Sequence, residues 1–137
     1  MIKRNYTKSI YSETWLNSEN GIVYQVISPK VKKINLEIAR QLVKDRKHAM
    51  GNPGYKVPVF VVVNNATSVD SEAKKYYAQP EAYREIQAIA MLMDNYVSKL
   101  VGSIVFSIKR PTVPTTFFNS EEKAISWLKR LNRHQLN

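Results

Sequence analysis

The sequence has no cysteine and few glycines, and each shortage excludes a class of functional site. Without cysteine the chain forms no disulfide, no thiolate nucleophile and no cysteine-ligated zinc or iron–sulfur centre. With four glycines in 137 residues, it has neither a phosphate-binding loop nor a dinucleotide fingerprint. The two histidines, His48 and His134, lie far apart and belong to no ligand pair. We therefore expect no metal, no cofactor and no catalytic residues.

Long apolar runs are missing as well. The longest, such as Val59–Val63 and Ala88–Met93, are far shorter than the roughly 18 residues that a membrane span needs. Residues 1–11 include basic side chains but lack the apolar core of a secretory signal. We expect a soluble, cytoplasmic protein with no membrane span.

Acidic residues are in the minority, with 11 Asp and Glu against 21 Lys and Arg and a formal net charge of +10. Residues 1–50 carry ten basic and four acidic side chains, residues 51–100 five of each, and residues 101–137 six and two. The basic excess therefore lies at the two ends of the chain. The length and the 44% hydrophobic content predict one domain over residues 1–137, with an ordered core over about residues 10–131.

Two segments near the start of the chain predict a β-hairpin. Ser9–Leu16 alternates between two faces, and Ile22–Ile27 is β-branched and aromatic. Asn20 and Gly21 lie between them, and both residue types tolerate the positive φ angles of a tight hairpin turn. The free edge of a hairpin can pair with a second copy of the chain, so the sequence leaves a homodimer open.

The first helix is predicted from Leu36, with Asn35 as its N-cap and Gly51 at its end. The continuous apolar run Val57–Asn64 follows. Such a run is typical of a strand that is covered on both faces, as in an α/β sheet.

The middle of the chain predicts short elements around a second buried strand. Asp70 or Ser68 caps a short helix that ends at Tyr77, and a helical turn follows around Glu81–Glu85. The unbroken apolar run Ala88–Met93 has no polar face and is short, which favours a buried strand over a helix.

The last third of the chain predicts a helix, a strand and a final helix. Apolar side chains recur at helical spacing over Val97–Ile108, and Thr115–Phe118 is a short strand. Asn119 or Ser120 caps the last helix. The element order is β-β-α-β-α-β-α-β-α, which predicts an α/β domain with a mixed five-stranded sheet and helices.

Three pairs of consecutive segments resemble a known family. They are Val57–Asn64 with Ser71–Lys74, Ala88–Met93 with Val97–Gly102, and Pro114–Phe118 with Glu122–Leu128. The chain resembles STAS domains, the anti-sigma-factor antagonists of the SpoIIAA-like fold, and most closely small uncharacterised bacterial STAS-like proteins. CRAL-TRIO lipid-binding domains are a looser resemblance. The resemblance implies a regulatory or protein-binding domain that is not an enzyme.

The resemblance also implies an interaction surface. In STAS antagonists the loop after the central strand, together with the following helix, contacts the partner protein, and a serine at the start of that helix is phosphorylated. Here Ser68 or Ser71 occupies that place, although both are also ordinary helix-capping residues. The partner-binding residues expected on this basis are Asn64, Asn65, Thr67, Ser68, Asp70 and Ser71.

Two further sets of residues suggest other functions. Four tyrosines, Tyr76, Tyr77, Tyr83 and Tyr96, either line a pocket for a small apolar or lipid-like ligand or form half-buried core.

A basic stripe on the first helix suggests a nucleic-acid or anionic-surface binder, or is an ordinary solvated face. The first helix has no aromatic residue interleaved with these cations, which weakens the case for single-stranded nucleic acid. The stripe consists of Lys33, Arg40, Lys44 and Lys47, with Arg46 beside it.

Overall fold

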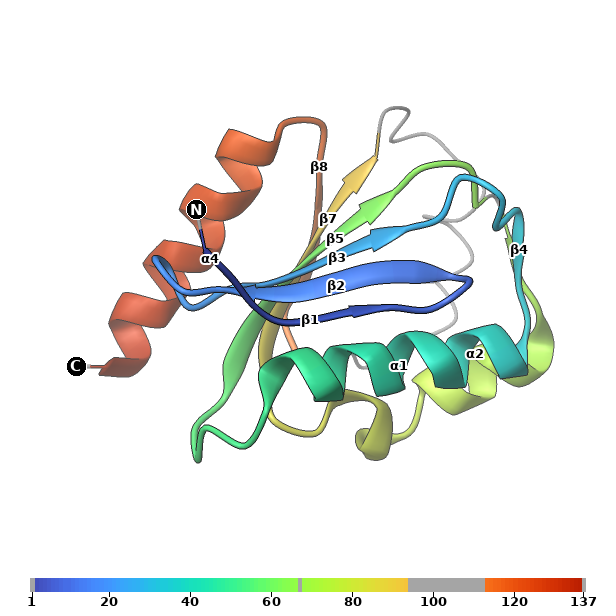
Figure 1. Ribbon diagram of the computed structural model, residues 1–137, viewed down its shortest axis with the longest axis horizontal. Coiled ribbons are helices and arrows are strands. Elements are labelled where there is room, and N and C mark those ends of the chain that lie inside the picture. The colour runs from blue at the N-terminus through green and yellow to red at the C-terminus, as the bar shows by residue number, and fades with distance from the viewer. Residues whose placement is uncertain (1, 67, 94–112, 137) are drawn as a thin grey trace.

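The computed structural model describes residues 2–66, 68–93 and 113–136, and its chain forms a mixed α/β fold (Figure 1). The main sheet contains β1 (Lys3–Lys8), β2 (Ser12–Asn17), β3 (Val23–Ile27), β5 (Val57–Val63), β7 (Ile86–Met93) and β8 (Thr115–Phe118). The described helices are α1 (Leu36–Met50), α2 (Ser71–Tyr77) and α4 (Glu121–Leu136), with a 3-10 turn η1 at Pro80–Tyr83. Two short strands, β4 (Lys33–Ile34) and β6 (Ser68–Val69), form a separate parallel pair.

The main sheet has the order β1-β2-β3-β5-β7-β8. Its first three strands are antiparallel, and β3, β5, β7 and β8 run parallel to one another. The predicted hairpin is confirmed, with Trp15 of β2 opposite Tyr24 of β3. β5 lies between β3 and β7, and its side chains join a hydrophobic core on each face of the sheet, which explains its unbroken apolar sequence.

The main sheet has six described strands where the sequence predicted five. The additional strand is β1, which is polar and has five exposed residues out of six. It therefore lacks the alternation of buried and exposed side chains that identifies a strand in a sequence. The β4–β6 pair was also missed, because two-residue strands leave no periodic pattern.

The helices cover opposite faces of the sheet (Figure 1). α1 packs against β1, β2 and β3 and lies beside α2, whereas α4 packs against β5, β7 and β8. The side chains of β5 divide accordingly: Val59 and Val61 join the core on the α1 side, and Phe60 joins the core on the α4 side. The exposed cations of α1 and those described on α4 consequently lie on opposite faces of the sheet.

Side-chain caps fix where the helices begin. Asn35 Oδ1 accepts a hydrogen bond from the Ile38 amide at 2.8 Å, as predicted. Of the two candidate caps for α2, Asp70 is the one that accepts, from the Ala73 amide at 2.9 Å. Ser120 Oγ accepts from the amide of Lys123 at the start of α4.

Two further predictions concern a helix near the end of the chain and the absence of a membrane span. The predicted helix Val97–Ile108 lies outside the described residues, as does Tyr96. Among the helices that are described, none combines the length and the apolar character that crossing a membrane would require.

Candidate functional site

The loop that follows β5 is tied to the end of β3. Asn64 Nδ2 donates a hydrogen bond to the backbone carbonyl of Ile27 at 2.8 Å. Asn65 Nδ2 donates to the carbonyl of Pro29, also at 2.8 Å. The amides of these two predicted partner-binding residues therefore hold the loop in place, while Thr67 lies outside the described residues.

The rest of the predicted loop leads into α2. Ser68 is half-buried in β6, which pairs with β4. The Asp70 carboxylate accepts a hydrogen bond from the Ala73 amide and so caps α2. Ser71 is the exposed first residue of α2. Phosphorylation stays a prediction for both serines, and Ser71 is the one whose side chain faces the surface.

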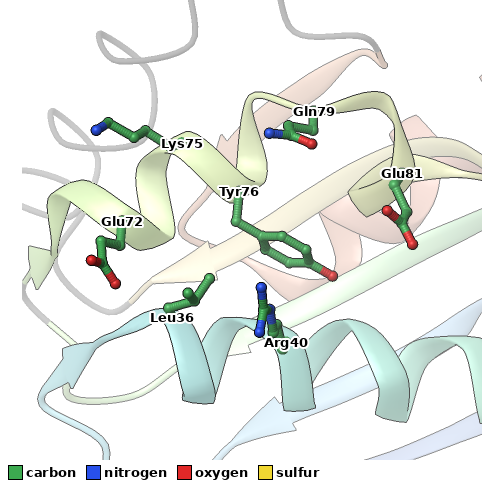
Figure 2. Close-up of a pocket in the computed structure, with 7 residues that line it drawn as sticks. All are labelled: Leu36, Arg40, Glu72, Lys75, Tyr76, Gln79 and Glu81. Atoms are coloured by element: carbon green, nitrogen blue, oxygen red, sulfur yellow. The ribbon is translucent and has the colours of Figure 1, made fainter.

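A groove with a volume of about 640 Å³ lies between α1 and the segment from α2 to η1 (Figure 2). We call it the α1–α2 groove. Apolar residues of α1 recur at i and i+4 spacing and are buried against the sheet, and this packing fixes the position of the helix that forms one wall of the groove. The groove is lined by Leu36, Arg40, Glu72, Lys75, Tyr76, Gln79 and Glu81.

The charged side chains of the α1–α2 groove are not paired with one another at short range. Within the described part of the chain, the ion pair closer than 4.0 Å joins Lys8 to Glu13, far from the groove. Figure 2 shows Arg40 directed toward the ring of Tyr76, with Glu81 beyond the Tyr76 hydroxyl. The groove thus presents an apolar and aromatic floor between unpaired charges of both signs.

The charged side chains near the groove shift the pKa of Tyr76. Partial burial raises the pKa of its hydroxyl, and the Glu81 carboxylate raises it further. The cations of Arg40 and Arg46 act in the opposite direction and lower it. Tyr76 therefore stays a neutral hydrogen-bonding group at physiological pH.

Three of the four tyrosines proposed to line a pocket lie near one another. The rings of Tyr76 and Tyr77 are 5.8 Å apart, and Tyr77 and Tyr83 are both buried in the core on the α1 side. Burial raises the pKa of Tyr77 to about 12. Tyr77 and Tyr83 thus act as core residues, while the apolar-ligand pocket stays a prediction.

The residues of the basic stripe do not all lie on the first helix as predicted, because Lys33 precedes α1. Arg40 and Lys44 are exposed on α1, Lys33 is exposed in β4, and Lys47 is half-buried. Arg46, which the sequence grouped with the stripe, is a correction: it is 4% exposed. Its Nε donates to Gln25 Oε1 at 2.6 Å, so it faces the sheet.

A buried polar network beneath α1 was not found from the sequence. Asp45 is 3% exposed, and its Oδ2 accepts hydrogen bonds from Ser9 Oγ at 2.7 Å and Ser12 Oγ at 2.8 Å. Its Oδ1 accepts from Gln41 Nε2 at 2.8 Å. The available signal was the Asp45-Arg46 pair, which interrupts the buried side of an amphipathic helix. The network fastens α1 to the β1–β2 turn.

The described residues contain no group of three or more His, Cys, Asp or Glu side chains that could hold a metal ion. The groove can hold a peptide or another elongated ligand through apolar contacts with its floor and polar contacts with its charged rim.

A family model described as "Domain of unknown function (DUF7793)" matches residues 14–132. The match begins within β2 and extends through most of α4, so it leaves β1 outside. No curated protein matches the chain.

A solved structure shares the fold. It is an uncharacterised protein of the DUF3478 family from Shewanella loihica PV-4, described as having a SpoIIAA-like fold. The TM-score is 0.60 at 11% sequence identity, with 89% of this chain and 98% of that chain covered. The SpoIIAA-like fold predicted from the sequence is therefore confirmed.

Proposed function

This chain belongs to the DUF7793 family, whose function is unknown, and we propose that it is a non-enzymatic domain that binds another protein at the α1–α2 groove. The observation that carries the proposal is the groove itself, an open surface of about 640 Å³ with an aromatic floor and unpaired charges. Such a surface fits a polypeptide segment that places an apolar side chain on the floor and charged groups at the rim.

The loop before α2 supports this proposal. Asn64 and Asn65 are bonded to the backbone at the end of β3, and Asp70 caps α2, so the edge of the groove is rigid before a partner arrives. A preorganised surface loses little conformational entropy on binding. In the proposed complex these residues position α2, and the side chains of α2 make the contacts.

The placement of the carboxylates in the groove supports a binding role over catalysis. The SpoIIAA-like neighbour is itself uncharacterised, so the likeness contributes the architecture and no reaction. The groove lining includes two carboxylates, Glu72 and Glu81, from separate elements, and Figure 2 shows them directed to opposite ends of the groove. General acid–base pairs need both groups beside one reacting atom.

The test compares partner capture by two matched variants of the full chain. Lys75→Glu combined with Gln79→Ala changes two exposed residues of the groove. Lys129→Glu combined with Ser126→Ala makes the same charge reversal and another replacement of a polar residue by alanine at exposed positions of α4, on the opposite face of the sheet. Proteins cross-linked to the wild-type chain in extracts of its source cells are identified by mass spectrometry.

We expect the groove variant to lose a specific partner that the wild-type chain and the α4 variant both capture. Reversing one rim charge in a buried contact typically weakens binding by tenfold or more, on the order of 1.4 kcal/mol. Equal capture by the two variants would remove the groove as the binding site.

A further inference from the structure

The outward side of α1 forms a second surface, distinct from the α1–α2 groove in its charge. Arg40 and Lys44 are exposed along it, Lys33 is exposed just before the helix, and Lys47 is half-buried at its end. We call these four residues the basic face. The carboxylate on the same exposed stripe is Glu37, which accepts a hydrogen bond from the Tyr11 hydroxyl at 3.4 Å. Cations therefore dominate this side of the molecule.

An exposed apolar side chain lies beside the basic face. Ile10, in the turn between β1 and β2, is 80% exposed. The residues on both sides of it are bonded to α1: Ser9 Oγ to Asp45 at 2.7 Å and the Tyr11 hydroxyl to Glu37. Ile10 is therefore held next to the helix.

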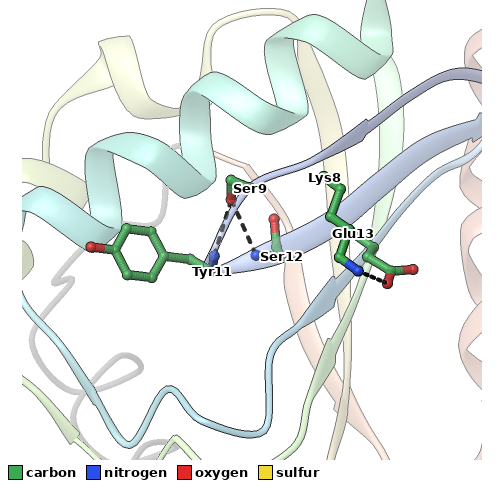
Figure 3. A network of polar contacts seen from close by, with 5 residues as sticks. All are labelled: Lys8, Ser9, Tyr11, Ser12 and Glu13. Carbon is green, nitrogen blue, oxygen red and sulfur yellow. Dashed lines mark hydrogen bonds and ion pairs between the residues drawn. The ribbon is translucent and has the colours of Figure 1, made fainter.

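The turn that carries Ile10 is locally fixed. Ser9 Oγ accepts hydrogen bonds from the backbone amides of Tyr11 and Ser12, both at 3.2 Å (Figure 3). The Ser28 amide donates to the Tyr11 carbonyl at 2.8 Å, which brings the loop with exposed Lys30 alongside. A bulky aliphatic side chain is thus presented to solvent on a rigid turn, with cations around it.

We propose that the basic face and Ile10 dock together on the surface of an anionic lipid bilayer. Basic clusters on a helix are attracted to anionic lipid headgroups, and each cation near such a surface raises the affinity by about fivefold. An aliphatic side chain that enters the interface adds the burial of its apolar area. Binding of this kind is peripheral and reversible, and it requires no segment that crosses the membrane.

The observations favour a bilayer over a nucleic acid. α1 contains no aromatic side chain on which bases could stack. The helix is also flanked by the β1–β2 turn on one side and by α2 on the other, whereas a helix that reads DNA has to enter the major groove. Ile10 finds an apolar environment in a lipid interface and none along a phosphate backbone.

This proposal stands apart from the protein-binding groove. Arg40 borders both surfaces, so it is left unchanged in the test. The remaining members of the basic face, Lys33, Lys44 and Lys47, do not line the α1–α2 groove. Loss of either activity can therefore be observed without loss of the other.

The experiment measures sedimentation of the purified full chain with vesicles of phosphatidylcholine alone or mixed with phosphatidylserine. Lys33→Glu combined with Lys44→Glu alters the basic face. Lys123→Glu combined with Lys129→Glu makes the same change in net charge at exposed positions of α4, on the other side of the sheet. Far-ultraviolet circular dichroism checks that both variants are folded.

We expect the wild-type chain to bind the phosphatidylserine vesicles and to release them as salt is added, because screening shortens from a range of about 10 Å at 0.1 M to about 3 Å at 1 M. The basic-face variant binds at least about tenfold more weakly, and the α4 variant binds like the wild type. Ile10→Ser weakens binding by about fivefold and leaves its dependence on salt in place.

Three results would overturn the proposal. One is the absence of binding to phosphatidylserine vesicles at low salt. Another is an equal loss in both charge-reversed variants, because net charge alone would then explain the binding. The third is binding to duplex DNA without binding to vesicles, which would assign the basic face to nucleic acid.

Discussion

At the scale of the residue, Asp45 is the side chain on which the attachment of α1 depends most. It is buried, and it accepts hydrogen bonds from Ser9, Ser12 and Gln41. The neighbouring Arg46 bonds Gln25, so the charges of these adjacent residues are satisfied by separate partners. Helical periodicity in the sequence does not reveal these bonds, because it does not show which hydroxyl and amide groups lie opposite the two side chains.

Replacing Asp45 with Ala is expected to lower the free energy of unfolding by about 3 kcal/mol, because it leaves three buried or half-buried donors without their acceptor. Lys44→Ala, at the adjacent exposed position, is the control and is expected to change it by less than about 0.5 kcal/mol. Urea unfolding followed by circular dichroism measures both. Similar values for the two variants would show that the network contributes little to stability.

At the scale of the element, the sequence predicted strands and helices where a hydrophobic period was strong. β5, β7 and α1 were identified from their apolar patterns, and the caps Asn35 and Asp70 marked two helix starts. β1 was missed because its position comes from specific contacts. Asn5 Nδ2 donates to the Ala49 carbonyl at the end of α1, and Lys3 Nζ lies 4.0 Å from the centre of the Trp15 ring.

The candidate site was predictable only in part, for the same reason. The loop at Asn64 and Asn65 was identified through a family resemblance, yet its side-chain amides bond the backbone carbonyls of Ile27, at the end of β3, and of Pro29, just after it. The α1–α2 groove was not predicted, because it depends on how two helices separated by 20 residues pack. A helical period gives the buried side of each helix but not the distance between them.

β1 is expected to open before the rest of the sheet. Its register with β2 shifts between Arg4 and Thr7, Asn5 has a φ of 51°, and its outer edge is unpaired within the described chain. Hydrogen exchange followed by NMR should show the β1 amides that are bonded to β2 exchanging at least about a hundredfold faster than amides of β5. Equal protection of the two strands would mean that β1 unfolds only with the whole domain.

At the scale of the whole molecule, the described cations of α1 and of α4 lie on opposite faces of the sheet. The basic face consists of three residues of α1 and Lys33 of β4, and the exposed cations of α4, Lys123, Lys129 and Arg130, lie across the sheet from α1. The sequence shows only that the basic excess lies at the two ends of the chain. Because the cations of α1 and α4 lie on opposite faces, each group has to be tested with its own variants.

The whole fold is expected to lose stability at alkaline pH through Tyr77. Burial raises the pKa of Tyr77 in the folded chain to about 12, above its ordinary value of 10.0. Below pH 10 the hydroxyl is protonated in both states. As the pH rises from 10 toward 12 the unfolded chain releases the proton first, so the free energy of unfolding falls, by about 2–3 kcal/mol in total.

Urea unfolding at pH values across this range should show a shallower decline for Tyr77→Phe, whereas Tyr55→Phe, at a position 67% exposed, should follow the wild type. An unchanged decline in Tyr77→Phe would place the alkaline sensitivity in other groups.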